Sequence, residues 1–406
     1  MMQKAIKWCC NSKVMCGLWI LLGLISALAK MSPTRHNNYD VFRYVFYNTW
    51  NGQSLYAPST DGGFWDMNHY GPFFSLIIAP FAVLPTWLGL LLWCTALAAF
   101  LYWAVKKYCT LVPQKSCSSN SMMTYIMPFI IWYCAHELLT ALFMQQFNVA
   151  IAAIILLSFY FVEKEHDEFA TLFIVIGTLV KLYGIVGLAF FFFSKHKKKY
   201  LLSLVGWSIA LFCLPILISS PDYQFSQYHE WFWDITEKND ENLFSIAQNI
   251  SLLGFVRKVG YGLTNSDWWV NSYSDLYLLL AGIVTMAIGY FRVNQWKNPY
   301  FRHTILAAIL MFVCLFSTGT ESSGYIIALT GCAIWFCISP WQRSKWDAAL
   351  MIFAFILTSL SPSDLFPAYL RREIIQPYAL KSLPVILIWG KLCYELITKK
   401  YDTIEF

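Results

Sequence analysis

The sequence predicts an all-α polytopic membrane protein, and two features carry this prediction. Of its 406 residues, 58% are hydrophobic and only 13% are charged, whereas about a quarter of the residues in a soluble domain are charged. Apolar runs long enough to cross a bilayer recur along the chain, and basic residues cluster between alternate runs, as they do in cytosolic loops. We therefore expect a helical bundle built around a lipid bilayer.

The first apolar run sets the orientation. Residues 14–30 follow a basic N-terminal segment containing Lys4, Lys7 and Lys13, which predicts a cytosolic N-terminus and an external first loop. Residues 72–84 contain prolines and are too short for a clean crossing. We expect them to form a juxtamembrane or re-entrant helix on the non-cytosolic side.

The later runs alternate so that basic clusters fall on the cytosolic side. Lys181 interrupts the run 169–193, which predicts two short helices meeting at this lysine, because a charge deep in lipid costs several kcal/mol. The other predicted spans are 86–105, 123–142, 147–162, 201–218, 275–291, 304–318, 323–339, 347–360 and 381–397. The sequence thus predicts about twelve crossings in a single domain, 1–406, with outer segments at 31–85 and 219–274.

The composition also excludes some function classes. The net charge of +6 comes from clusters such as 195–199, which mark a cytosolic face rather than a nucleic-acid partner. No Gly-rich nucleotide loop occurs in the predicted cytosolic turns. Asp61 and Asp66 have a DxxxxD spacing, which is a weak signal for a metal site, and the sequence contains no DxD motif. We expect no nucleic-acid partner, no metal and no cofactor.

Asp40 follows the first span on the predicted outer side and is the strongest candidate for chemistry. An ionised carboxylate there can accept the proton of a sugar hydroxyl that attacks an electrophilic carbon. The alternatives are a helix N-cap or a solvated loop acid. We interpret Asp40 as the catalytic base.

Two cations are candidates for binding a phosphate. Lys181 is an ionisable group within an apolar stretch, which is a functional hypothesis by default; the alternatives are snorkelling or pairing with an acid such as Glu137. Arg257 could hold a phosphate oxygen through its planar guanidinium. We predict that Lys181 and Arg257 bind a donor phosphate.

A third group of polar residues from remote segments is predicted to reach the same membrane face, where it could bind a sugar or an acceptor. Side-chain amides can pair with sugar hydroxyls, but a polar helix face on the bilayer, a helix cap or a headgroup-level aromatic pair would use the same residue types. The predicted sugar- and acceptor-binding residues are Gln248, Asn249, Glu321, His69, Tyr70, Gln146 and Asn148.

Several segments together resemble a known family. They are YDVFRYVFYNTWNGQSLY, HYGPFFSLIIAPFAVLPTWLGLLLW, QQFNVAIAAIILLS, GTLVKLYGIVGLAFFF and AQNISLLGFVRK. In this order they cover about residues 38–260, and the chain resembles the GT-C glycosyltransferases, in particular the polyprenol-phosphate-mannose-dependent mannosyltransferases of glycosyltransferase family 87. Two departures stand out: the usual Gly-Gln pair is Gln145-Gln146 here, and a late His-containing element reads Glu321-Ser322-Ser323.

The resemblance implies a GT-C-like bundle and an inverting transfer of a sugar, expected to be mannose, from a polyprenyl-phosphate monosaccharide. The acceptor would be a glycan or glycolipid on the non-cytosolic face, and the role of base carries over to Asp40. A polymerase or ligase of lipid-linked glycans, or a transporter or flippase, remains as an alternative. We expect a bacterial inner membrane with the active site facing the periplasm.

Overall fold

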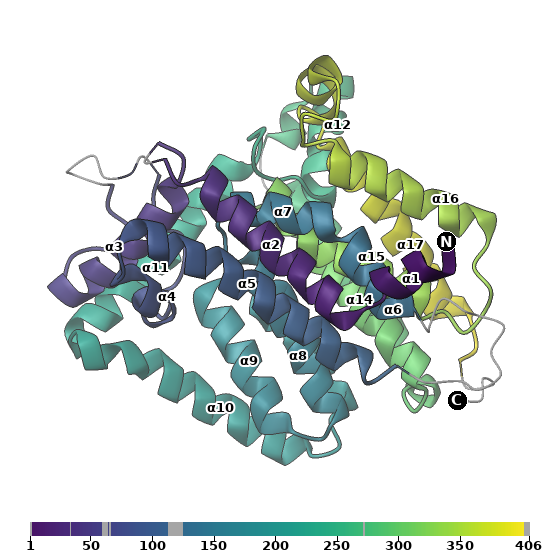
Figure 1. The fold of residues 1–406 in the computed structure, drawn as a ribbon, viewed down its shortest axis with the longest axis horizontal. Coiled ribbons are helices and arrows are strands. Elements are labelled where there is room, and N and C mark those ends of the chain that lie inside the picture. Colours follow the sequence, from purple (N-terminus) through teal and green to yellow (C-terminus); the bar gives the residue numbers. More distant parts are fainter. Residues whose placement is uncertain are drawn as a thin grey trace. The chain divides into compact units, whose positions relative to one another are not determined.

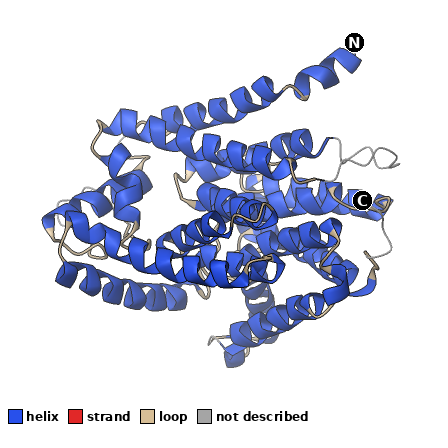
Figure 2. Cartoon of the chain, turned by 90° about the horizontal axis from the view of Figure 1, so that it is seen from below, coloured by secondary structure: helices blue, strands red, loops and turns tan. Residues whose placement is uncertain are grey.

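In the computed structural model the chain is helical throughout, with no strand among the residues that it describes, which are 2–32, 34–58, 64, 66–112, 125–270 and 273–401. These residues form two compact units, one made of Cys16–Tyr108 and Ala141–Glu237, the other of Met1–Met15, Cys109–Thr140 and Lys238–Phe406. We call them the Asp40 unit and the Arg257 unit and describe each by itself (Figures 1 and 2). The predicted all-helical class is confirmed.

The Asp40 unit holds the helical segments from α2 to α11, apart from α6 and α7. Its helix α8 carries apolar residues on every side and is buried along almost its whole length, as expected for a helix without a polar face. Helix α9 packs between α8 and α10. The elements are α2 (Ser12–Ala29), α3 (Asn37–Asn51), α4 (Phe74–Ala82), α5 (Thr86–Cys109), α8 (Asn148–Glu163), α9 (Asp167–Val180), η2 (Leu182–Phe193), α10 (Lys197–Cys213), η3 (Leu214–Ile218) and α11 (Pro221–Asn242), where η marks a 3₁₀ or π segment.

The predicted break at Lys181 is confirmed. The backbone of Lys181 is extended (φ −149°, ψ 103°) and separates α9 from η2, which pack against each other. A Cβ added at Gly177 would lie 2.9 Å from Cα of Gly184, so two glycines permit this close approach. The chain therefore places Lys181 at a reversal rather than in the middle of a straight helix.

The Arg257 unit is built around α14 and α15, which pack against each other and are buried on nearly all sides. Side-chain caps define some helix starts: Ser344 and Asp347 form a capping box, and Asn298 caps the helix that begins at Pro299. The elements are α1 (Met2–Cys9), α6 (Ile126–Tyr133), α7 (Ala135–Phe143), α12 (Leu252–Thr264), η4 (Asp267–Trp269), α13 (Tyr273–Tyr290), η5 (Val293–Gln295), α14 (Pro299–Leu315), η6 (Ser322–Gly324), α15 (Tyr325–Cys337), α16 (Lys345–Phe353), η7 (Ala354–Leu360), η8 (Leu370–Ile375), η9 (Leu380–Ser382) and α17 (Leu383–Thr398).

Among the described residues, three helices are long and apolar enough to cross a membrane: Ser12–Ala29, Thr86–Cys109 and Lys197–Ile218. The pair α6 and α7, bent by 44°, would make a fourth if it forms one span. The short helix expected within 72–84 is present as α4. The larger count of about twelve crossings, and the sidedness, stay predictions.

Candidate active site

Asp40 lies in the first turn of helix α3, not in the polar loop that the sequence predicted. Its side chain is 15% exposed, and its Oδ2 lies 2.6 Å from Nδ1 of His36, the residue that precedes the helix. Asp40 is therefore neither an N-cap nor a fully solvated loop acid. No other hydrogen bond to the Asp40 carboxylate is found in the described part of the chain, so its Oδ1 keeps its acceptor capacity.

The electrostatic surroundings of Asp40 favour a basic carboxylate. Burial raises the pKa of Asp40 above its ordinary value, and the nearby charge and hydrogen bond of His36, together with the charge of Arg43, act in the opposite direction. A carboxylate with a raised pKa accepts a proton more readily than an ordinary aspartate does.

Lys181 has polar and aromatic neighbours. Its Nζ donates to Oδ1 of Asn148 at 2.8 Å and lies 4.8 Å from the ring centre of Tyr183 and 5.8 Å from that of Tyr70. Aromatic faces attract an ammonium group without neutralising it. Three residues of the predicted site, Lys181, Asn148 and Tyr70, thus lie close together, and their roles stay predictions.

His69 belongs to the same region, because the backbone N–H of Gly71 donates to Val180 O at 3.0 Å and so joins the 69–71 segment to the end of α9. Both oxygens of Asp234 lie 3.0 Å from Nδ1 of His69. A carboxylate beside one ring nitrogen fixes the orientation of an imidazole. Sequence reasoning missed Asp234, which lies on the distant helix α11.

One turn connects the surroundings of Asp40 with those of Lys181. We call residues 144–148, between α7 and α8, the 144–148 turn. On one side, Gln145 Oε1 accepts from the backbone N–H of Tyr39 at 3.1 Å. On the other, Phe147 N–H donates to the Tyr70 hydroxyl at 3.0 Å, and Asn148 binds Lys181. A single segment thus contacts both the residue next to Asp40 and the ammonium of Lys181.

The 144–148 turn also explains a departure from the family pattern. Gln145 has a positive φ of 58°, which glycine adopts at little cost and other residues rarely adopt. The glycine of the usual Gly-Gln pair suits this backbone. Here the glutamine side chain gains the contact with Tyr39, and its neighbour Gln146 accepts from Asn148 Nδ2 at 2.8 Å.

The Arg257 unit brings together another part of the predicted site. Gln248 Nε2 donates to Glu321 Oε1 at 2.9 Å. The backbone N–H groups of Asn249 and Ile250 donate to carbonyls of Thr318 and Thr320 at 2.9 and 2.8 Å, which ties the two segments together. Gln248 and Glu321 precede helix α12 and helix α15 and are both half-buried, so they can present an amide and a carboxylate side by side.

Asn249 takes a structural position in this pair of segments. Its side chain is fully buried, its φ is 51°, and its Nδ2 donates to Leu243 O at 3.1 Å while its Oδ1 accepts from Ser251. The sequon Asn249-Ile250-Ser251 is thus folded away from solvent. The role of Asn249 in sugar binding stays a prediction.

Arg257 is fully buried and is ion-paired with Asp275, with 2.8 Å between Nη2 and Oδ2, and it also donates to the carbonyl of Trp269. The adjacent Lys258 donates to three backbone carbonyls, at Ser245, Gln248 and Asn249, and burial lowers the pKa of Lys258 to about 8. Lys258 thus holds the segment around Gln248, whereas Arg257 contacts Asp275 and Trp269. The predicted phosphate-binding role of Arg257 stays a prediction.

Glu137, the alternative partner considered for Lys181, pairs with Lys381 instead. Nζ of Lys381 lies 2.8 Å from Oε1 of Glu137, and both side chains are almost fully buried. Lys381 also donates to the hydroxyl and the carbonyl of Ser322, beside Glu321. The pair comes from segments 244 residues apart, which is why sequence reasoning did not find it.

The comparison with known families agrees with this arrangement. The profile of glycosyltransferase family 87 matches residues 68–318, which is more than half of the chain. The chain belongs to glycosyltransferase family 87. Among the curated proteins, a search finds no match.

Membership of family 87 makes the protein a glycosyltransferase, and its apolar helices suggest a lipid bilayer as its environment. The match includes His69, Tyr70, Lys181, Gln248 and Arg257. Asp40 and Glu321 lie outside the matched residues. The structure nevertheless joins Asp40 to the matched part through the 144–148 turn.

Proposed function

We propose that this family 87 enzyme transfers a sugar from a polyprenyl-phosphate monosaccharide to a glycan or glycolipid acceptor. The proposed sugar is mannose, and its anomeric configuration is inverted in the transfer. The observation that carries the proposal is that one segment, the 144–148 turn, contacts both Tyr39, next to the half-buried carboxylate of Asp40, and the ammonium of Lys181. A carboxylate and an ammonium supply a base for a hydroxyl and a cation for a phosphate.

In the proposed step Asp40 Oδ1 takes the proton of the acceptor hydroxyl, whose oxygen bonds to the anomeric carbon. The bond between that carbon and the phosphate oxygen breaks, and its electron pair leaves with the polyprenyl phosphate. Negative charge grows on the phosphate as it leaves, and Lys181 would stabilise that charge. The chemistry we propose uses no metal or other cofactor, since a phosphate is already a fair leaving group.

The other predicted residues take supporting roles. His69, fixed by Asp234, and Tyr70, Gln146 and Asn148 would orient the donor around Lys181. Within the Arg257 unit, Gln248 and Glu321 would bind sugar hydroxyls through an amide and a carboxylate. We place the reaction on the non-cytosolic face of a bacterial inner membrane, in agreement with the basic segments predicted to face the cytosol.

The test is to incubate the purified protein in lipid with polyprenyl-phosphate mannose or with a lipid-diphosphate oligosaccharide, adding a membrane lipid extract as the acceptor source. Consumption of the monosaccharide donor, with a product of inverted anomeric configuration, supports the proposal. Consumption of the oligosaccharide instead indicates a polymerase or ligase. Movement of intact donor across vesicles without transfer indicates a flippase.

A further inference from the structure

We propose that His36 is a positioning residue for the base: by donating to Oδ2 of Asp40, it holds the carboxylate so that Oδ1 faces the acceptor hydroxyl. This inference rests on the proposed function, in which Asp40 removes the acceptor's proton. It adds a residue outside the matched family region and outside the predicted site.

The geometry is the first argument. His36 precedes helix α3, and its ring reaches Asp40 four residues on, with 2.6 Å between Nδ1 and Oδ2. Within the described chain this is the one hydrogen bond of the imidazole, whose side chain is only 8% exposed. A buried ring committed to a single carboxylate oxygen fixes the orientation of that carboxylate.

The backbone around the pair is held from two directions. Asp40 N–H donates to His36 O at 3.0 Å, which fixes the first turn of α3. Gln145 Nε2 also reaches the carbonyl of Arg35 at 3.4 Å. The His36–Asp40 pair is therefore anchored at both ends, and rotation of the carboxylate is the freedom that the histidine removes.

His36 does not cap this helix through its side chain. Its side chain makes no capping hydrogen bond to the backbone of α3, although a capping residue is the usual occupant of such a position. Replacing it should therefore disturb Asp40 more than the helix.

The charges that face Asp40 are few. On α3 itself Arg43 lowers the pKa of the Asp40 carboxyl, as His36 does, against the larger effect of burial. Tyr39 lies next to it on the same helix, and Gln145, from the 144–148 turn, is neutral. Loss of His36 should thus move the pKa of Asp40 further upward.

Two variants test the proposal. In His36→Asn the amide can still donate to Asp40 from about the position of Nδ1, whereas His36→Ala cannot. With polyprenyl-phosphate mannose as donor we expect His36→Ala to lower kcat by about 10- to 100-fold, the size of effect that misplacement of a reacting group produces. The donor KM should stay within about twofold, and His36→Asn should recover most of the rate. The matched control is His166→Ala, an exposed histidine of the same unit.

A second measurement needs no donor. Carbodiimide labels protonated carboxyl groups, so the pH at which labelling of the Asp40 peptide reaches half its maximum follows its pKa. We expect this midpoint to move to higher pH in His36→Ala and to move less in His36→Asn, which keeps the hydrogen bond but not the charge. Unchanged labelling and kcat in His36→Ala would overturn the proposal, as would equal impairment of the two variants.

The result also separates this inference from the proposed function. If Asp40→Asn is inactive while His36→Ala behaves as the wild type, the base stands and the positioning role is wrong. If Asp40→Asn retains activity, the assignment of the base is wrong. If the labelling midpoint shifts but neither lipid donor is consumed, the contact is real and the donor class is wrong.

Discussion

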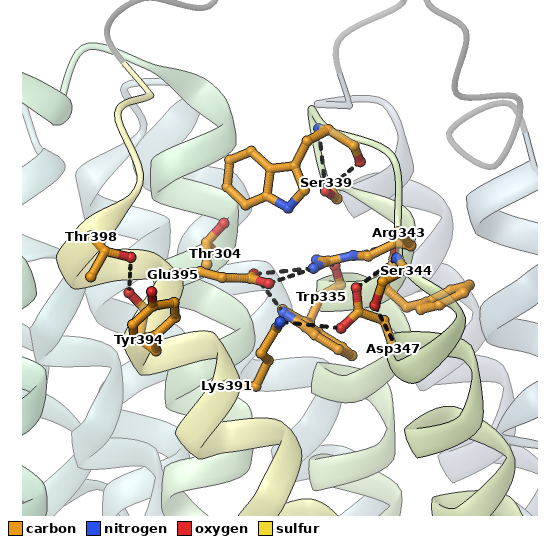
Figure 3. Close-up of polar contacts among 12 residues, drawn as sticks. Thr304, Trp335, Ser339, Arg343, Ser344, Asp347, Lys391, Tyr394, Glu395 and Thr398 are labelled. Atoms are coloured by element: carbon orange, nitrogen blue, oxygen red, sulfur yellow. Dashed lines mark hydrogen bonds and ion pairs between the residues drawn. The ribbon is translucent and has the colours of Figure 1, made fainter.

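Two carboxylates in different units, Asp40 and Glu395, are both largely removed from water, yet their surroundings differ. Glu395 is 2% exposed, and both of its oxygens contact Arg343 Nη1, at 2.8 and 3.1 Å. Its Oε2 also accepts from Trp335 Nε1 at 2.9 Å (Figure 3). The described structure gives Asp40 one hydrogen bond to one oxygen and leaves its side chain 15% exposed.

Further charged and aromatic side chains surround the Glu395–Arg343 pair. The Arg343 guanidinium lies 4.1 Å from the ring centre of Trp335, and beside it Asp347 completes the Ser344 capping box and lies 3.6 Å from Lys391 (Figure 3). This network ties α15, α16 and α17 together. The comparison indicates that a carboxylate satisfied on both oxygens stabilises the fold, whereas one satisfied on a single oxygen can still accept a proton.

The largest expected effect is on catalysis at Asp40. Asp40→Asn should lower the transfer rate by about 10²- to 10⁴-fold, the usual contribution of a general base, without a large loss of thermal stability. The measurement is the initial rate with polyprenyl-phosphate mannose, together with thermal unfolding in detergent. Asp222→Asn, an exposed acid of the same unit, is the control. Full turnover by Asp40→Asn would remove the contrast with Glu395.

The effect of changing Glu395 should be on stability. Glu395→Ala leaves Arg343 buried without its partner, which costs about 3–5 kcal/mol in typical buried ion pairs, and thermal unfolding should report it. The double variant Arg343→Met with Glu395→Leu should recover much of the loss. Glu241→Ala, which removes an exposed partner of Lys238, should have an effect of about 1 kcal/mol or less. A stable but inactive Glu395→Ala would place this cluster in the chemistry instead.

A third prediction concerns Lys181 and the binding of the sugar donor. Lys181→Met keeps the length of the side chain and removes its charge, so we expect kcat/KM for the donor to fall by about 100-fold, as when one stabilising donor is removed. Lys195→Met, which changes an exposed lysine, should not alter it. Unchanged kinetics at limiting donor would contradict the phosphate-binding role.

The smallest effect is expected at Gln145. Gln145→Gly removes the cost of a positive φ, about 1 kcal/mol or more, and also the hydrogen bond to Tyr39, about 0.5–1.5 kcal/mol, so stability should change little. Gln145→Ala keeps the unfavourable positive φ and loses the hydrogen bond to Tyr39. It should therefore unfold at a lower temperature than the wild type and than Gln145→Gly. Equal stability of the glycine and alanine variants would show that the backbone there is not strained.

Much of the architecture could be read from local patterns. The helix break at Lys181, the short helix within 72–84 and the start of a helix near Thr86 each follow from an adjacent charge, proline or turn. Contacts between remote segments could not be read in this way. Asp234 with His69, and Glu137 with Lys381, are joined across 165 and 244 residues, and no local periodicity encodes such pairings.

The His36–Asp40 pair lies between these two cases. Its spacing of four residues is that of neighbours on one helix face, so the sequence contained a usable signal. The sequence predicts a loop at Asp40, where such a spacing has no geometric meaning, and only the helix Asn37–Asn51 brings the two side chains together.

The sequence by itself determined the helical class, the break at Lys181 and the resemblance to family 87, because apolar periodicity, isolated charges and short motifs are local properties. Only the tertiary structure decided which carboxylates are satisfied and which can accept a proton. That depends on where distant donors such as Arg343 and Trp335 arrive when the helices pack. A buried polar atom finds its partner in space rather than along the chain.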